Sequence, residues 1–375
     1  MKQLVLVGAG HAHALLLRDW ARSPPPGVSV TVVSPEPLAP YSGMVPGWLA
    51  GAYRFDEIVV DFPRLCAAAG AHWLQDGLQA LDPARRELRL ASGARLGYEW
   101  LSLNVGSTLR PPSLPGTVLS LRPLSALRSA WEPLLQAPAP MATLLSPRPA
   151  AEARELPPLR LAAVGAGAAG FESLLAVLAQ CRQRQPGRHV HAQLIGRGQA
   201  LLPGLGAVAR GLAQRALLRA GATLQLGVED GVARAAQADL VLWATGALAQ
   251  AWQTDPERRG SLAVSAEGFV RIDEQLRSVS HPEIFAVGDC AQAPEPLPKA
   301  GVFAVRMGPV LAHNLRAAMA GQPLQAYRPQ RRFLALLATG DGRAIASRGA
   351  LAAAGRWAWH WKDHIDRGFL RRLQG

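Results

Sequence analysis

Two short glycine-rich turns, far apart in the chain, constrain its fold more than any other feature of the sequence. The first, at residues 8–10, follows an apolar run at residues 4–7, and the second, at residues 165–170, follows one at residues 159–164. Such runs are typical of strands buried on both faces, and each turn leads into a helical stretch whose N-terminus can bind a diphosphate. The sequence therefore predicts an α/β fold with two Rossmann-like dinucleotide-binding domains.

The first turn matches the dinucleotide pattern only in part. Gly8 and Gly10 are present, but His13 stands where the third glycine is expected. The acid that would bind the ribose hydroxyls is also displaced, because the next strand ends with Ser34 and the nearest carboxylate is Glu36.

The second turn is a complete G-x-G-x-x-G, formed by Gly165, Gly167 and Gly170. The strand predicted after it ends at Gly196, and Arg197 follows. An arginine at this point accommodates the 2′-phosphate of NADPH, but it is equally a solvated loop residue in an arginine-rich chain. The choice between NADH and NADPH stays open.

The chain carries 40 Lys and Arg against 27 Asp and Glu, a formal charge of +13. This excess is compatible with nucleic acid, an anionic membrane or a solvated surface, and no nucleic-acid motif occurs. More than half of it lies in the last fifty residues, beside an apolar stripe with a spacing of four. The stripe consists of Trp357, Trp361, Ile365, Phe369 and Leu373. We expect either an interfacial membrane helix, or a helix that packs on its own core or on a partner, including a second copy of the chain.

Cysteine and histidine usage argues against metal and disulfide chemistry. The cysteines Cys66, Cys181 and Cys290 lie far apart with no metal-type spacing, which favours a reducing compartment such as the cytoplasm. His11 and His13 do not share a helix face, so we expect no metal site, although either imidazole would titrate near neutrality. No apolar run is long enough to span a bilayer, so a membrane contact would be peripheral, on the inner surface.

Three further segments extend the two turns into a family pattern. Residues 244–246 read Ala-Thr-Gly after a predicted strand, residues 104–107 form a degenerate counterpart, and residues 281–289 end in Val-Gly-Asp. With these segments the chain resembles the FAD-dependent pyridine nucleotide-disulfide oxidoreductase superfamily over nearly its whole length. The resemblance implies that Asp289 bonds the ribityl chain of FAD.

The resemblance also implies a domain order, in which an FAD-binding domain is split around an NAD(P)H-binding domain. We expect the FAD domain at residues 1–120 and 265–325, the NAD(P)H domain at residues 121–264 and a C-terminal segment at residues 326–375. The residues expected to hold FAD are Gly8, Gly10, His11, Ser34, Glu36, Asn104, Gly106, Gly288, Asp289 and Lys299. Those expected to hold the nicotinamide nucleotide are Gly165, Gly167, Gly170, Arg197, Thr245 and Gly246.

Within the superfamily, the chain departs from the members that use cysteine. Residues 41–47 contain no cysteine pair, which excludes dithiol chemistry, and the sulfide:quinone reductases also need cysteines near the flavin. The type II NADH dehydrogenases are more similar, but residues 300–308 lack the glutamines that line their quinone site, so the acceptor stays open. Pro298 and Lys299 resemble a Pro-Lys pair of the ferroptosis-suppressing quinone reductases, and Glu172 matches a glutamate of both groups.

A flavoprotein module that is fused to the N-terminus of selenophosphate synthetase in many bacteria is more similar still. The shared segments are residues 8–13, 40–44, 298–302 and 339–347. This similarity implies a link to selenium handling, with selenophosphate synthetase as a candidate partner.

Lys299 and Glu172 are the candidate catalytic residues. Lys299, the only lysine away from the two ends of the sequence, would stabilise the reduced flavin; alternatively it is a surface lysine. Glu172 would border the nicotinamide and pair with Lys299; alternatively its carboxylate caps a helix. We expect hydride transfer from NAD(P)H to FAD and then to an unidentified acceptor, quinone-like or related to selenium or sulfur. Two other functions stay open: a flavin-containing, redox-sensing partner of selenophosphate synthetase, and a flavoprotein that oxidises sulfide or selenide.

Overall fold

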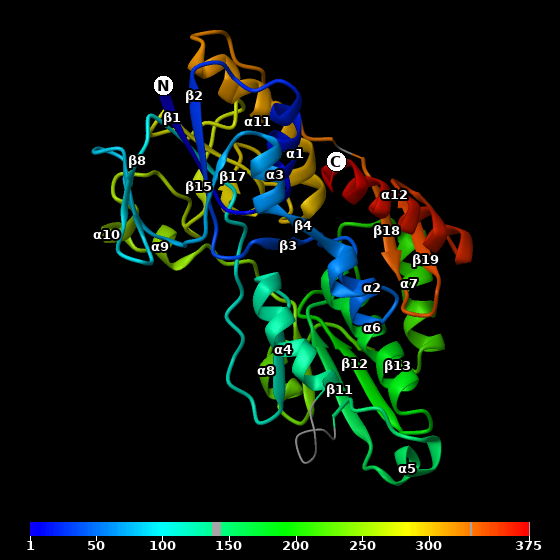
Figure 1. The fold of residues 1–375 in the computed structure, drawn as a ribbon. Helices are drawn as coiled ribbons and strands as arrows, with labels where there is room; N and C mark the ends of the chain where they lie inside the picture. Colours follow the sequence, from blue (N-terminus) through cyan, green and yellow to red (C-terminus); the bar gives the residue numbers. More distant parts are fainter. Residues whose placement is uncertain (137–143, 331, 375) are drawn as a thin grey trace.

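Two five-stranded parallel sheets form the framework of the chain in the computed structural model, which describes residues 1–136, 144–330 and 332–374 (Figure 1). The first sheet has the order β16 (Ile284–Ala286), β9 (Trp100–Leu103), β1 (Lys2–Val7), β2 (Val28–Val33) and β5 (His72–Leu74). The second has the order β10 (Thr117–Ser120), β14 (Leu240–Trp243), β11 (Leu159–Val164), β12 (Val190–Ile195) and β13 (Ala222–Gln225). The predicted α/β fold with parallel sheets is confirmed.

The first sheet is built from both ends of the sequence. Its strand β16 comes from residues 284–286, whereas the whole second sheet lies within residues 117–243. The second sheet begins at Thr117, slightly before the expected boundary at residue 120. The central strands are apolar and buried over most of their length, as expected for sheets covered on both faces; Leu4, Leu6 and Leu161 are at most 1% exposed.

Helix α1 (His11–Arg22) begins directly after the first glycine turn, and α6 (Ala168–Arg184) begins within the second and includes Gly170. Helix α11 (Gly301–Met319) packs along α1. The remaining elements of the first region are β3 (Leu38–Pro40), α2 (Val45–Leu49), the 3-10 helix η1 (Phe55–Ile58), β4 (Val59–Asp61), α3 (Phe62–Ala68), β6 (Leu78–Asp82), β7 (Glu87–Leu90) and β8 (Arg95–Gly97). Those of the second region are α4 (Leu124–Gln136), α5 (Ala150–Glu155), α7 (Ala207–Arg219) and α8 (Gly231–Ala235). Between the second sheet and α11 lie α9 (Ala251–Thr254), α10 (Pro256–Arg259), β15 (Val270–Arg271), the 3-10 helix η3 (Gly288–Cys290) and β17 (Ala291–Gln292).

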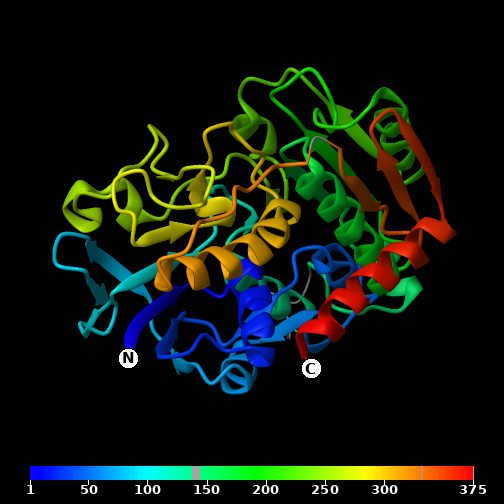
Figure 2. The same ribbon diagram turned by 90° about the horizontal axis from the view of Figure 1, so that it is seen from above.

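The C-terminal segment bridges the two regions. Strands β18 (Leu334–Ala338), β19 (Ala344–Arg348) and β20 (Leu351–Gly355) form an antiparallel sheet that contacts α6 and α7. Helix α12 (Arg356–Gln374) then runs back to β4 and α1, as Figure 2 shows. Among the described helices, none is both long and apolar enough to cross a bilayer.

The apolar stripe of α12 divides between core and surface. Phe369 and Leu373 are buried, whereas Trp357, Trp361 and Ile365 are 52%, 41% and 37% exposed. The two tryptophans stack on one another, with ring centroids 6.2 Å apart. The C-terminal half of the helix is therefore ordinary core, and the N-terminal half presents an apolar face to solvent.

The most deeply buried cation of α12 is Lys362, a lysine near the end of the sequence. The Lys362 side chain is 7% exposed, and its Nζ donates to Asp366 Oδ2 at 2.7 Å and to the carbonyl oxygen of Gly43. The hydrogen bond to Gly43 ties the last helix to the loop that follows β3, some 300 residues earlier in the sequence.

We expect Lys362→Met to lower the free energy of unfolding by about 3 kcal/mol or more, because it leaves the Asp366 carboxylate buried without its partner. Denaturant titration of the wild type and the variant measures this loss. Arg371→Met, an exposed site on the same helix, should change stability by less than about 0.5 kcal/mol. A similar small change in Lys362→Met would contradict the role of the ion pair.

Candidate functional site

The first glycine turn lies where three parallel strands end side by side. Val7 of β1 pairs with Val33 of β2 and with Leu103 of β9, so the loops after these strands converge. Gly8 has φ +100°, and a Cβ atom there would lie 2.4 Å from the carbonyl oxygen of Asn104. The turn therefore needs glycine for both its backbone angle and its space.

Asn104, which follows β9, holds this turn against the start of α1. Its Oδ1 accepts hydrogen bonds from the amides of Ala12 (3.2 Å) and His13 (3.4 Å), and its Nδ2 donates to the carbonyl oxygen of Val287 (3.0 Å). A Cβ at Gly10 would lie 2.1 Å from Asn104 Oδ1. The side chain caps α1 at its second and third amides and leaves the first amide, at His11, without a side-chain cap.

His13 stands at the position of the third glycine, and its buried imidazole forms hydrogen bonds through both ring nitrogens. Its Nδ1 lies 2.8 Å from the carbonyl oxygen of Gly8, and its Nε2 lies 2.8 Å from Ser102 Oγ. A carbonyl only accepts, so Nδ1 carries the proton and Nε2 accepts from the serine hydroxyl. Burial lowers the pKa of His13 to about 4, and that of His11 likewise to about 4. The expectation that either histidine titrates near neutrality is therefore wrong.

The second turn repeats the arrangement at β11. Val164 pairs with Ile195 of β12 and Trp243 of β14, so the three strands end together. A Cβ at Gly170 would lie 1.9 Å from the carbonyl oxygen of Gly165, which makes glycine obligatory there. Gly167 faces open space, and no side chain caps the start of α6. Free amides at a helix N-terminus fit the diphosphate of a dinucleotide.

The other residues predicted for the nicotinamide nucleotide border this second turn. Thr245 and Gly246 follow β14, and Gly246 has φ +61°. Arg197 follows β12 and is exposed, with no hydrogen bond or ion pair to any described residue. The guanidinium is therefore available to a ligand at the edge of the turn.

Asp289 belongs to a polar cluster with Arg122, Ser107 and the chain at Lys299. Arg122 Nη1 lies 2.6 Å from Asp289 Oδ2, and Arg122 Nη2 donates to the carbonyl oxygen of Lys299 at 2.9 Å. Ser107 Oγ donates to the same carboxylate oxygen at 3.3 Å and accepts from Arg122 Nη1. The structure thus brings the segments at residues 104–107 and 288–299 together, and adds an arginine that the sequence did not indicate.

The side chain of Lys299 turns toward the protein. Its Nζ donates to the carbonyl oxygen of Ala291 at 2.6 Å and lies 3.7 Å from the centre of the Phe269 ring. Desolvation is the main cause that lowers the pKa of Lys299, although the nearby Asp289 opposes it. The amine is thus an oriented cation beside the Asp289 cluster.

Glu172 belongs to a second polar cluster, under α12. Its Oε1 accepts from the amide of Ala338 at 2.7 Å, and burial raises the pKa of Glu172 to about 7, against the opposing charge of Lys362. Asp366 bonds both Lys362 and the hydroxyl of Tyr41, and Tyr41 lies 5.3 Å from the ring of His11. The cluster therefore joins the start of α1 to the first turn of α6.

The structure does not bring Glu172 and Lys299 together. The two share no hydrogen bond or ion pair, and the cation that acts on Glu172 is Lys362. The expected pairing of the two candidate catalytic residues is therefore replaced by two separate clusters. Of the remaining predicted residues, Ser34 is buried at the end of β2, Glu36 is exposed beyond it, and Gly106 and Gly288 have φ +67° and +70°.

None of the three cysteines is poised for thiolate chemistry. Burial raises the pKa of Cys66 and Cys181 to about 12 and that of Cys290 to about 11. All three are free and buried. Within the described residues no group of three or more His, Cys, Asp or Glu side chains is arranged to hold a metal ion.

Comparison with known proteins gives a family match over most of the chain. Residues 2–308 match the family described as pyridine nucleotide-disulphide oxidoreductase. The chain belongs to this family. With the two glycine turns, this membership supports FAD and NAD(P)H as its cofactors. The two turns fit such ligands for two reasons. A Cβ atom at Gly8, Gly10 or Gly170 would clash with neighbouring atoms, so only glycine allows these tight turns. Nothing lies within 4 Å of a Cβ at Gly167, and no side chain caps the N-terminus of α6, which leaves room for a diphosphate there.

Individual relatives are distant in sequence. An alternative NAD(P)H-ubiquinone oxidoreductase C1 of Arabidopsis thaliana is 24% identical over 324 residues, and the match covers 75% of this chain and 60% of that protein. Sulfide:quinone oxidoreductase from Aquifex aeolicus superposes with a TM-score of 0.77 at 16% identity, over 100% of this chain and 92% of that chain. NDH2 from Plasmodium falciparum, solved with NADH, superposes with a TM-score of 0.74 at 12% identity, over 99% of this chain and 97% of that chain. These superpositions establish the fold.

Three residues of the two clusters were missed by the sequence reasoning. Arg122 lies in no recognisable motif, and Lys362 and Asp366 do not belong to the apolar stripe of the terminal helix. The spacing of Lys362 and Asp366, four residues apart on one helix face, was the available signal.

The raised pKa of Glu172 predicts a pH dependence of stability. Between about pH 4.5 and pH 7 the folded state holds a proton on Glu172 that the unfolded state has lost, so stability falls as pH rises and levels off above pH 7. The contribution is at most about 1.4 kcal/mol per pH unit. Denaturant titrations at several pH values should show a shallower dependence in Glu172→Gln. Equal slopes for both proteins would contradict the assignment.

Proposed function

We propose that the chain is an FAD-dependent NAD(P)H oxidoreductase that passes a hydride from NAD(P)H to FAD and on to a quinone-like acceptor. The observation that carries this proposal is the pair of glycine turns, each at the carboxyl end of a central parallel strand where the strand order reverses. Ligands of open α/β sheets bind in that crevice. The family match over residues 2–308 supports the same activity.

The first turn would hold FAD, which when bound accepts a hydride and releases electrons singly or in pairs. Gly8 and Gly10 admit the backbone to the diphosphate, and the free amide of His11 points along the axis of α1. Asp289, oriented by Arg122 and Ser107, would accept a hydrogen bond from a hydroxyl of the ribityl chain. Asn104 supports this site from behind as the cap of α1.

Two oriented cations stand beside Asp289. Arg122 is held by the carboxylate, and Lys299 is held by the carbonyl oxygen of Ala291 and the face of Phe269. Preorganised positive charge stabilises negative charge that develops on reduction, without reorganising water. This supports Lys299 as the residue that tunes the reduced cofactor.

The acceptor is proposed to be reduced without thiol chemistry. The buried, protonated cysteines leave the chain no accessible thiolate, which disfavours a sulfide-oxidising route that depends on cysteine. Glu172, with a pKa near neutrality, is suited to exchange a proton with an acceptor that needs one. The Arabidopsis relative is named for ubiquinone, which supports a quinone-like molecule here.

Anaerobic mixing of the flavin-loaded protein with NADH or NADPH should bleach the flavin absorbance, and a short-chain quinone should restore it. We expect Lys299→Ala to slow one of these two phases about tenfold or more while the flavin stays bound, because the oriented charge is lost. Arg271→Ala, which removes an exposed arginine from the neighbouring strand β15, is the control. Unchanged stopped-flow traces in Lys299→Ala would remove the residue from the mechanism.

A link to selenium handling is a finer proposal that rests on the sequence similarity at residues 8–13, 40–44, 298–302 and 339–347. It makes selenophosphate synthetase the partner of the chain. Bleaching of the flavin by selenide in the absence of NAD(P)H would favour a flavoprotein that oxidises selenide. A tight complex with the synthetase in which neither NAD(P)H nor selenide bleaches the flavin would favour a redox-sensing partner.

The exposed part of α12 is proposed to lie on an anionic membrane surface. Trp357, Trp361 and Ile365 form an apolar face on a helix that also carries Arg356 and Arg371. Amphipathic tryptophan side chains with flanking cations are suited to the bilayer interface.

In a flotation assay we expect the wild type to rise with vesicles that contain anionic lipid, because the tryptophans and arginines act together. The double variant Trp357→Gln, Trp361→Gln should stay in the lower fraction. A matched control, Val208→Gln together with Leu218→Gln on α7, replaces exposed apolar residues elsewhere. Flotation of both double variants with the vesicles would contradict the proposed contact.

A further inference from the structure

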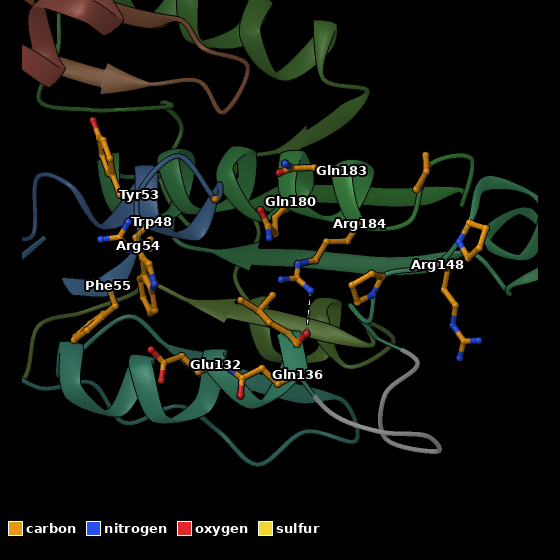
Figure 3. A pocket seen from close by; sticks show the side chains of 15 residues that line it. Trp48, Tyr53, Arg54, Phe55, Glu132, Gln136, Arg148, Gln180, Gln183 and Arg184 are labelled. Atoms are coloured by element: carbon orange, nitrogen blue, oxygen red, sulfur yellow. Dashed lines mark hydrogen bonds between the residues drawn. The ribbon is translucent and has the colours of Figure 1, made fainter. Parts of the chain in front are cut away.

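A cavity of about 750 Å³ lies between the two dinucleotide-binding regions, away from both glycine turns. One wall comes from α2 and the segment before η1, and the others come from α4 and the last turns of α6 (Figure 3). No glycine of either turn lines it, and neither do Asp289, Lys299 or Glu172. Its volume lies in the range of small-molecule sites.

Arg184 points from α6 across this cavity toward α4. Its Nη1 donates to the carbonyl oxygen of Leu135 at 2.9 Å. With the Gln180 amide oxygen turned toward it, Nε donates to that oxygen at 2.8 Å, while the amide nitrogen donates to the carbonyl oxygen of Ala50. Partial burial lowers the pKa of Arg184. Two neutral acceptors among the described residues, the Leu135 carbonyl and the Gln180 amide, therefore hold the Arg184 guanidinium in this direction.

The charge of Arg184 is not neutralised within the described chain. The two other arginines that line the cavity are paired, Arg54 with Asp56 at 2.9 Å and Arg148 with Glu152 at 3.4 Å. No carboxylate of the described residues lies within ion-pair distance of Arg184. A partly buried cation without a counter-charge is costly, and an anion bound in front of it would recover that cost.

The other end of the cavity is aromatic. Trp48 and Tyr53 are almost fully buried, and Trp48 makes an edge contact with Phe55, with centroids 5.4 Å apart. Figure 3 shows these three rings on the side of the cavity away from Arg148, with Arg184 between. Of the three rings, Phe55 is the partly exposed one, and the Arg128 guanidinium lies 3.9 Å from its centre. This ring, backed by Trp48, and the oriented Arg184 further along suit a ligand with a flat apolar part and a single anionic group.

The geometry points to a third ligand site in this chain, besides the two nucleotide turns, for a small molecule that carries a flat apolar ring and a carboxylate or phosphate. The anion bonds Arg184, and the ring packs against the aromatic wall. Because α2 and α6 belong to the two different regions, the bound molecule contacts both. The site is independent of the proposed redox reaction.

Isothermal titration calorimetry on the flavin-loaded full chain, with NAD⁺ in excess to occupy the nucleotide turn, tests the site with phenyl phosphate. We expect phenyl phosphate to bind more tightly than inorganic phosphate or phenol, which each supply one half of the ligand. Arg184→Gln should weaken binding of phenyl phosphate about tenfold or more, because a charge-assisted hydrogen bond is lost.

Two further variants keep this test decisive. Arg182→Gln removes an exposed arginine two residues away on α6, whose Nη2 bonds the carbonyl oxygen of Ala220, and should change affinity less than about twofold. Glu132→Gln removes the lining carboxylate on α4 and should strengthen binding severalfold. Equal losses in Arg182→Gln and Arg184→Gln, no gain in Glu132→Gln, or equal affinity for phosphate and phenyl phosphate would overturn the proposal.

Discussion

The absence of a Cβ atom at Gly8 and Gly10 is the constraint on which the first nucleotide site depends. Any side chain there would overlap the backbone or the amide of Asn104. Because Asn104 also caps α1 and bonds Val287, the same side chain links the end of β9 to the start of α1 and to the residue after β16. The turn, the helix and a strand from residues 284–286 are thus positioned by one side chain, and that strand closes the split domain.

Two polar clusters extend this framework in opposite directions. One joins Asp289, Arg122 and Lys299 across the junction between the regions, and the other joins Glu172 to Lys362 and Asp366 of the last helix. The second cluster gives part of the C-terminal charge a structural use, since Lys362 is buried among carboxylates. The exposed arginines and tryptophans of α12 are left for a surface contact.

Local features of the sequence predicted the framework, whereas contacts between distant segments escaped it. Apolar runs and glycine patterns specify the strands and turns because their physical causes lie within a few residues. Arg122 meets Asp289, and Lys362 meets the carbonyl oxygen of Gly43, through packing between segments more than 150 residues apart in the sequence. His13 shows the same limit: a missing glycine suggested a weak site, yet the imidazole fills the space between α1 and β9 and bonds Ser102. At Gly170, where a Cβ would lie 1.9 Å from Gly165, no such replacement fits.

The central claim is that the first turn holds the flavin and the second holds the reduced nicotinamide nucleotide. The most direct test is the flavin content of Gly10→Ala and Gly170→Ala, together with bleaching of any bound flavin by NADH under anaerobic conditions. We expect Gly10→Ala to lose its flavin, and Gly170→Ala to keep the flavin but lose its reduction by NADH. Retained flavin in Gly10→Ala, or lost flavin with intact folding in Gly170→Ala, would contradict the assignment of the two sites.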